Sequence, residues 1–315
     1  MQMHKEFDRE KVQAVLDAIA GRMAGEADRG EVANYIPELA EVSLNQFGIA
    51  VAPLEGPPII AGDAEVPFSI QSISKVFGLV VALQCVGATL WRRVGREPSG
   101  DPFNSIVQLE FERGKPRNPF INPGAIVVSD VILQNAENTK NQHPVLKLCR
   151  TLAKDPTVSI DNAVYASEAA TGERNRALAY FMLAEGNLEG DVTAVTESYF
   201  QQCSIAMSCS QLATATRFLA AVGEYGAADA VGMTVERARR VNALMMTCGC
   251  YDASGEVAFR VGLPCKSGVG GGIIAIAPGH GSIAAWCPGL DEKGNSVLAL
   301  KALEEVARKL KWSVF

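Results

Sequence analysis

Apolar residues recur at helical spacing close to both ends of this 315-residue chain. Residues 8–24 predict a helix that ends near Gly21 or Gly25, because their apolar side chains share one helical face. Those side chains are Val12, Val15, Leu16 and Ile19. A similar stripe in residues 296–310 predicts a helix that closes the chain, and it consists of Leu303, Val306 and Leu310.

Between these helices, short apolar runs predict strands at 48–52, 59–61, 257–261, 272–277 and 282–286. Residues 53–58 are rich in proline and glycine, and 278–281 read Pro-Gly-His-Gly, so each predicts a turn that joins two strands. Helical patterns dominate from about residue 129 to 247. Within that stretch Ser208 and Gln211 form a capping-box pattern, which predicts a helix start.

This order of elements predicts an α/β chain of the α+β type, in which one antiparallel sheet is flanked by helices and carries an inserted helical lobe. We expect a single catalytic domain over residues 1–315. Its α/β lobe takes in approximately 1–70 and 250–315, and its helical lobe approximately 71–249. A functional cleft is expected between the two lobes.

Composition and charge exclude several classes of function. Hydrophobic residues make up 48% and charged residues 20% of the chain, which is typical of a globular protein. The net charge is −6 and the basic residues are scattered, so nucleic acid is not expected as a partner. The apolar run 76–91 is interrupted by Gln84 and is shorter than the roughly 18 residues that a membrane helix needs. It predicts a buried core helix and no membrane partner.

The eight cysteines and three histidines lack the spacing of a metal site or a disulfide framework. We therefore expect no metal, no cofactor and mostly buried thiols. The charged residues 1–10 lack the apolar stretch of a signal peptide, which predicts a cytoplasmic location.

The most informative motif is Phe68-Ser-Ile-Gln-Ser72-Ile-Ser-Lys75, which opens the apolar run. Side chains three apart share a helix face, so the Lys75 amine can reach the Ser72 hydroxyl. Near a helix start, where Ser69 is the candidate cap, unpaired N–H groups favour a developing anion. A neutral Lys75 could then accept the Ser72 proton, which requires its pKa to fall from about 10.4 toward roughly 7–8. On its own, however, this spacing also occurs by chance in many helices.

A second element, Lys266-Ser267-Gly268, precedes a predicted strand. Ser-x-x-Lys followed by Lys-[Ser/Thr]-Gly is the arrangement of serine β-lactamases and penicillin-binding proteins. In that arrangement the second lysine is a cation that helps to keep the first one neutral. A Ser-His-Asp triad is not supported, because only His280 is a candidate base and no Gly-x-Ser-x-Gly motif exists. The glycines after Lys266 precede a strand, so they do not predict a phosphate loop.

Nearly the whole chain resembles the bacterial-type glutaminases, serine-dependent relatives of that β-lactamase-like fold. The matching words are Tyr35-Ile-Pro-Glu-Leu, Gly62-Asp-Ala, Phe68-Ser-Ile-Gln-Ser-Ile-Ser-Lys75, Asn118-Pro-Phe-Ile-Asn122-Pro-Gly-Ala-Ile, Ser167-Glu168, Thr171-Gly-Glu-Arg-Asn175, Tyr199-Phe-Gln-Gln-Cys-Ser, Cys248-Gly-Cys-Tyr251-Asp and Lys266-Ser-Gly-Val269-Gly-Gly-Gly. The resemblance implies hydrolysis of L-glutamine and a homo-oligomer, either a dimer or a tetramer.

The resemblance also implies a glutamine pocket made of Tyr35, Gln71, Ser72, Asn122, Glu168, Asn175, Tyr199, Tyr251 and Val269. Glu168 would bind the ammonium group of the substrate, and Asn122 and Asn175 would bind its carboxylate. Backbone N–H groups of Ser72 and Val269 would form an oxyanion hole. Tyr251 would relay a proton to the departing ammonia, and Ser72, Lys75, Tyr251 and Lys266 would form the catalytic set.

Each polar side chain of this set also has a purely structural interpretation. The tyrosines could be core residues, Asn122 could organise a turn, and Asn175 could cap a helix. Glu168 could pair with Arg174 at the surface. Two other functions share the motifs: a hydrolase of β-lactams or peptidoglycan, whose substrates lie outside the cytoplasm, and a non-catalytic amino-acid sensor. An intact Ser72–Lys75 pair favours an enzyme over a sensor.

Overall fold

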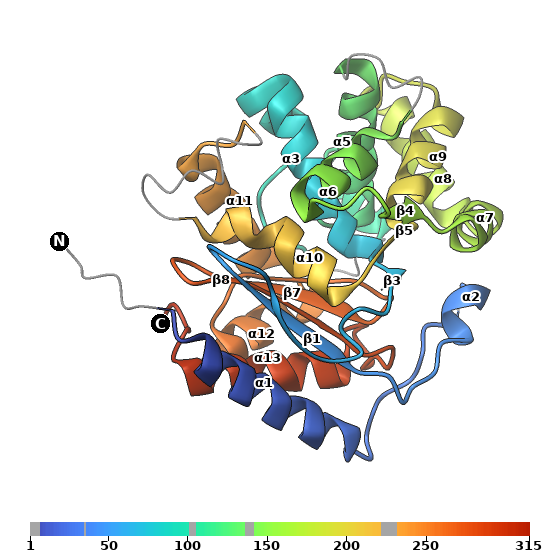
Figure 1. The fold of residues 1–315 in the computed structure, drawn as a ribbon. Coiled ribbons are helices and arrows are strands. Elements are labelled where there is room, and N and C mark those ends of the chain that lie inside the picture. Colours follow the sequence, from blue (N-terminus) through green and yellow to red (C-terminus); the bar gives the residue numbers. More distant parts are fainter. Residues whose placement is uncertain (1–6, 35, 101–104, 136–141, 222–231) are drawn as a thin grey trace.

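A five-stranded antiparallel sheet, of strand order β2-β1-β8-β7-β6, forms the centre of the α/β lobe (Figure 1). The computed structural model describes residues 7–34, 36–100, 105–135, 142–221 and 232–315. The strands are β1 Gly48–Pro53, β2 Ile59–Gly62, β6 Cys265–Ser267, β7 Gly272–Ala277 and β8 Gly281–Trp286. The predicted antiparallel sheet with flanking helices is confirmed, and so are four of the five predicted strands.

Both faces of the sheet are buried, because successive strand residues point into two different cores. In β1, Ile49 and Val51 join one hydrophobic cluster, whereas Ala50 and Ala52 join the other. One face is covered by the first and last helices, α1 Arg9–Ala24 and α13 Val297–Leu310, together with α12 Ser254–Val261. The predicted terminal helices are therefore confirmed. Asp8 and Ser296 cap them through their side chains.

The other face of the sheet carries α10 Cys209–Thr216, and the helical lobe lies beyond it (Figure 1). The predicted capping box at the start of α10 is confirmed, since Ser208 and Gln211 satisfy each other's backbone N–H groups. A three-stranded sheet lies at the base of this lobe. The remaining elements are α2 Pro37–Ala40, β3 Phe68–Ser69, η1 Gln71–Ile73, α3 Ser74–Val86, η2 Gly87–Arg92, α4 Ile106–Phe111, α5 Asn122–Asn135, α6 Pro144–Ala153, β4 Ser159–Ile160, α7 Asn162–Ala170, α8 Glu173–Ala184, α9 Val192–Cys203, β5 Ile205–Met207, η4 Arg217–Ala220, α11 Val235–Cys248 and η6 Tyr251–Ala253.

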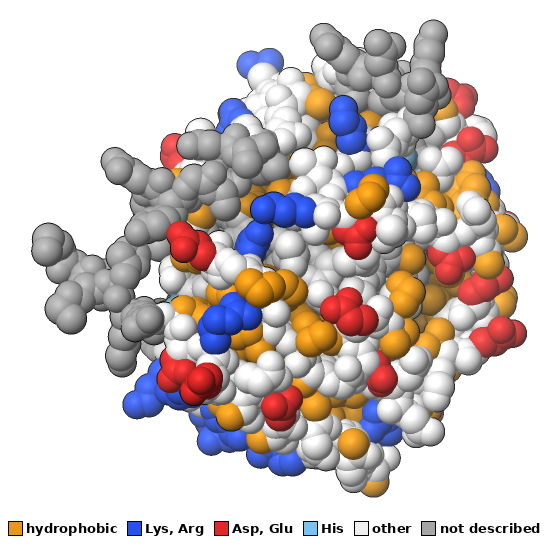
Figure 2. Space-filling model, in the orientation of Figure 1, with side chains coloured by type: hydrophobic (Ala, Val, Ile, Leu, Met, Phe, Trp, Pro, Cys, Tyr) orange, Lys and Arg blue, Asp and Glu red, His pale blue; other side chains and the backbone are white. Residues whose placement is uncertain are grey.

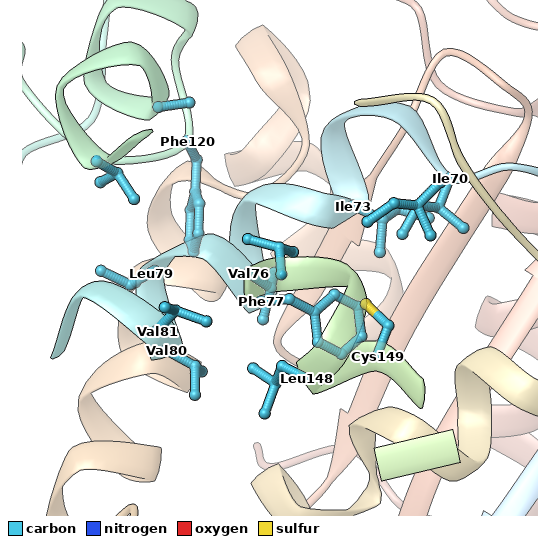
Figure 3. Packing of buried hydrophobic residues seen from close by; sticks show 14 of the residues in the cluster. Ile70, Ile73, Val76, Phe77, Leu79, Val80, Val81, Phe120, Leu148 and Cys149 are labelled. Atoms are coloured by element: carbon cyan, nitrogen blue, oxygen red, sulfur yellow. The ribbon is translucent and has the colours of Figure 1, made fainter. Parts of the chain in front are cut away.

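The predicted core helix is confirmed as α3, which lies inside the helical lobe. Figure 3 shows the Phe77 ring lying against Leu148 and Cys149 of α6. With its flanking turns, Gln71–Arg92 is 22 residues long and apolar enough to cross a membrane, so the sequence-based limit on its length is wrong. However, 67% of its most apolar window is buried within the molecule, which is typical of a core helix.

Two further predictions from the sequence are wrong. Residues 257–261 form the end of α12 and no strand, because Val257 and Val261 are four residues apart and both face the core. Phe259, which lies between them, is 88% exposed. Ser69 does not cap a helix: it lies in β3, where its Oγ donates to the carbonyl oxygen of Cys203. The helix itself begins later, at Ser74.

Candidate active site

The turn between β3 and α3 presents Ser72 at the start of the buried helix. Gln71, directly before it, has a left-handed backbone with φ of 48°. Such a conformation costs a non-glycine residue about 1 kcal/mol or more, so surrounding contacts must hold it in place. This strained residue opens the short 3₁₀ turn η1, which carries Ser72 and leads directly into α3.

Lys75 lies on the next turn and is 1% exposed. Its Nζ donates to Asn122 Oδ1 at 2.7 Å and to the carbonyl oxygen of Phe120 at 3.2 Å. Burial lowers the pKa of Lys75 from 10.5 to about 8, against the opposing influence of Cys203 and Glu168. A substantial fraction of Lys75 is therefore neutral in mildly alkaline solution and can accept a proton.

Lys266 is also fully buried and lies on β6, the edge strand of the large sheet. Its Nζ donates to the carbonyl oxygen of Ser267 and lies 4.9 Å from the centre of the Tyr251 ring. Burial, reinforced by the Lys75 ammonium, lowers the pKa of Lys266 to about 7. Burial thus favours the neutral form of both amines, whereas the sequence motif suggests that Lys266 is a cation.

Glycines after β6 allow this strand end to lie directly on the nucleophile turn. A Cβ atom on Gly268 would lie 2.5 Å from the carbonyl oxygen of Ile70, and one on Gly270 would lie 2.1 Å from that of Ser69. Both distances are too short for any side chain, so only glycine permits the approach. Val269, between the two glycines, is thereby brought beside Ser72 at the same cavity.

This cavity measures about 240 Å³ and lies between the helical lobe and the end of β6. Its walls are Gln71, Ser72, Asn122, Glu168, Thr171, Arg174, Asn175, Tyr199, Cys203 and Val269. Seven of these ten residues belong to the pocket that the resemblance implies. Tyr35, which the resemblance also implies, lies outside the described residues.

Sequence reasoning missed three wall residues: Thr171, Arg174 and Cys203. Thr171 and Arg174 belong to the same sequence motif as Asn175, residues 171–175. Cys203 follows Tyr199 by one helical turn of α9, so helical spacing could have identified it. Burial raises the pKa of Cys203 to about 12, which makes its thiol a poor nucleophile.

The polar wall residues form a connected network. Asn122 Nδ2 donates to Asn175 Oδ1 at 3.0 Å, and the Tyr199 hydroxyl donates to Asn122 Oδ1 at 3.2 Å. Glu168 is buried in the wall of the cavity and does not lie at the surface. Burial raises the pKa of Glu168, while a hydrogen bond from Gln71 and the charge of Lys75 act in the opposite direction. The network offers one carboxylate for a cation and two amides for an anion.

Tyr251 contacts the nucleophile from the side of the α/β lobe. It opens η6 with a left-handed backbone, φ 51°, and its hydroxyl interacts with the Ser72 side chain, which acts to lower the pKa of Tyr251. Burial raises the pKa of Tyr251, so its hydroxyl keeps a proton that it can donate. Tyr251, Lys75 and Lys266 do not line the cavity but lie directly behind its wall.

Within the described ranges, no three His, Cys, Asp or Glu side chains come together in a way that could hold a metal ion. The side chains gathered at the site are a serine hydroxyl, two buried amines and a phenol.

Comparisons with known proteins find relatives over almost the whole chain. The family model described as Glutaminase matches residues 30–315. A glutaminase of Methylobacterium sp. (strain 4-46) is 57% identical over 301 residues, which cover 96% of this chain and 97% of that protein. A glutaminase of Rhodopseudomonas palustris is likewise 57% identical, with the same coverage.

Solved structures give the same result. The structure titled probable glutaminase ybaS has a TM-score of 0.90 and 37% identity, and the match covers 98% of this chain and 99% of that one. The structure of Mglu in its glutamate form has a TM-score of 0.87 and 32% identity, with 96% and 69% covered.

Proposed function

The chain belongs to the glutaminase family, and we infer from that membership that it hydrolyses the side-chain amide of L-glutamine to L-glutamate and ammonia. The observation that carries this function is the buried Ser72–Lys75 pair beside a cavity that also holds Glu168 and two amide side chains. A cavity of about 240 Å³ suits one amino acid, and its polar groups suit both charged ends of a zwitterion.

We propose that the reaction proceeds through a γ-glutamyl ester of Ser72. Neutral Lys75 accepts the Ser72 hydroxyl proton as the oxygen attacks the amide carbon. The resulting oxyanion receives hydrogen bonds from the backbone N–H groups of Ser72 and Val269. The C–N bond then breaks as Tyr251 gives its proton to the leaving nitrogen, and the protonated Lys75 restores that proton. Water next attacks the ester carbon and gives a proton to neutral Lys75. The bond between this carbon and Ser72 Oγ then breaks, and Lys75 passes the proton to Ser72 Oγ, which releases glutamate.

Substrate recognition is assigned to the remaining wall residues. Glu168 binds the α-ammonium, and Asn122 and Asn175 bind the α-carboxylate. Tyr199 holds Asn122 in position through its hydroxyl. The same binding set includes Gln71 and Tyr35. The scheme assigns every step to side chains or backbone groups, so it invokes neither metal nor cofactor.

The domain organisation, cellular location, partners and oligomeric state are proposed on separate grounds. Residues 1–315 act as one catalytic domain with the two lobes given above. A cytoplasmic location is supported by all eight cysteines being free thiols. Acidic and basic side chains are interspersed on the face shown in Figure 2, which gives no support to nucleic acid as a partner. A homo-oligomer is supported by exposed apolar side chains on α4 and α8, and light scattering would measure its size.

The test is ammonia release from L-glutamine by the purified protein. The wild type should release ammonia, and a short quench should trap a γ-glutamyl group on the peptide that contains Ser72. Ser72→Ala should abolish both signals. Ser74→Ala is the matched control, because Ser74 is a buried serine two residues away that pairs with Gln202 and takes no part in the proposed chemistry. An active Ser72→Ala variant would exclude the proposed nucleophile.

A further inference from the structure

Gln71 is held on several sides although its backbone is strained. Its side chain is buried, and its Nε2 donates to Ser69 Oγ at 3.2 Å. Ser69 Oγ donates in turn to the carbonyl oxygen of Cys203 at 3.0 Å. The glycine loop after β6 packs on the same place, since a Cβ atom on Gly270 would meet Gln71 Cγ at 3.6 Å. These contacts fix the left-handed turn that precedes Ser72.

The Gln71 side chain also lies in the same cavity wall as Glu168, and its amide favours the charged form of that carboxylate. An amide nitrogen carries two hydrogens, so the one that does not serve Ser69 is available to Glu168. Gln71 therefore lies between the group assigned to bind the substrate ammonium and the turn that carries Ser72. Glu168 and Ser72 lie on different elements, α7 and η1, and both line the cavity.

We propose that Gln71 is a positioning residue that couples recognition of the α-ammonium by Glu168 to the geometry of the Ser72 turn. An ammonium bound to Glu168 fixes the carboxylate, the carboxylate fixes the Gln71 amide, and the amide fixes the oxyanion-hole N–H of Ser72. The α-amino group of glutamine then raises the rate of the chemical step as well as the affinity. This inference rests on the proposed function, because it assigns Glu168 to the substrate ammonium.

The test compares L-glutamine with glutaramate, which keeps the amide and the carboxylate but lacks the α-amino group. Ammonia release gives kcat and KM for both substrates in the wild type and in Gln71→Met, which keeps the size of the side chain but loses both donors. The kcat for glutamine should fall roughly tenfold to a hundredfold, as expected for a slightly misplaced reacting group. The kcat for glutaramate should change by less than about twofold, because the coupling is not engaged without an ammonium.

Gln71→Gly separates the backbone from the side chain. Glycine adopts a left-handed conformation without strain, so this variant keeps the turn but lacks the amide. It should lose kcat for glutamine as Gln71→Met does. Recovery of wild-type kcat in Gln71→Gly would show that only the backbone conformation matters and would overturn the coupling. Gln202→Met, which changes another buried glutamine outside the cavity wall, is the control for general effects of the substitution.

Other outcomes are equally decisive. Equal losses of kcat for both substrates in Gln71→Met would indicate a purely structural role. A raised KM with unchanged kcat would indicate simple binding. In a Glu168→Gln background the Gln71→Met loss should disappear, and an additive loss would overturn the coupling even if glutaramate reacts too slowly to measure. A wild type that releases no ammonia from glutamine would instead contradict the proposed function.

Discussion

The substitution Lys266→Met tests which of the two buried lysines carries the charge in the active enzyme. The sequence motif suggests that Lys266 is a cation and keeps Lys75 neutral, so its removal should raise the Lys75 pKa. The structure predicts otherwise, because burial lowers the pKa of Lys266 to about 7 and that of Lys75 to about 8. We therefore predict that Lys266 is neutral when Lys75 titrates and that burial is the main cause of the lowered Lys75 pKa.

The expected magnitude follows from these values. Activity requires neutral Lys75, whose pKa is lowered, so kcat/KM should rise with pH through about 8 and then level off. In Lys266→Met this rising limb should stay within about half a pH unit of the wild type, since a neutral neighbour exerts no Coulomb repulsion. Asn122→Asp is the positive control: an anion 2.7 Å from the Lys75 amine should raise its pKa and move the limb to higher pH.

Stability provides an independent readout for the same variant. An unfolded lysine keeps its proton up to about pH 10.4, whereas folded Lys266 loses it near pH 7. Unfolding therefore takes up a proton between these values, and the free energy of unfolding rises with pH there. The pKa difference of about 3.5 corresponds to a cost of at most about 5 kcal/mol at pH 7. Losing the hydrogen bond to Ser267 costs about 1–2 kcal/mol, so Lys266→Met should gain about 3 kcal/mol.

The assay is kcat/KM for glutamine from about pH 6 to 10, with urea unfolding at pH 7 and 9. Lys147→Met, the same change on an exposed lysine of α6, is the control and should alter neither measurement. A rising limb that moves up by a full pH unit in Lys266→Met would refute the reasoning and restore Lys266 as a cation. A loss of stability at pH 7 would refute the assigned cost of burying Lys266.

Three further outcomes are expected. Lys75→Ala should abolish ammonia release about as completely as Ser72→Ala, and the double variant should be no worse, since both act as one unit; a stopped assay with circular dichroism as the folding check would show this. Asparagine should react on the order of 100-fold more slowly than glutamine in the same assay, because its amide is one methylene short of Ser72; equal rates would mean that the pocket is misassigned. Gly270→Ala should lower both the melting temperature and kcat, because its Cβ would lie 2.1 Å from the carbonyl oxygen of Ser69, and an unchanged enzyme would show that the loop can shift freely.

Local signals in the sequence predict most of the fold. Caps, turn residues and apolar spacing identify the terminal helices, the helix after Ser208 and four strands, because each depends on neighbours within a few residues. The failure at 257–261 has a physical cause: with apolar residues at 257, 259 and 261, the segment fits both a strand and a helix. Only tertiary packing, which buries the first and last and exposes Phe259, decides between them.

The sequence predicts the chemical groups of the site better than it predicts the contacts between them. Ser72, Lys75 and Lys266 follow from residue type and spacing, and the resemblance adds the pocket residues. The contact between Lys75 and Asn122 joins positions 47 residues apart, and no local pattern predicts it. The lowered pKa values of the two lysines are likewise beyond the sequence, because they depend on the tertiary packing that buries each amine.

Left-handed backbone conformations fall into two groups, those at helix ends and those near the nucleophile. Five non-glycine residues in the described part of the chain have left-handed backbones. Three of them, Arg113, Lys154 and Lys311, lie at or just after helix ends, where this conformation commonly terminates a helix. The other two each open a 3₁₀ helix: Gln71 directly precedes the nucleophile, and the Tyr251 side chain interacts with it from the α/β lobe. Among the described non-glycine residues, the left-handed backbones that terminate no helix therefore lie beside Ser72, where a rigid geometry favours the transition state over the substrate.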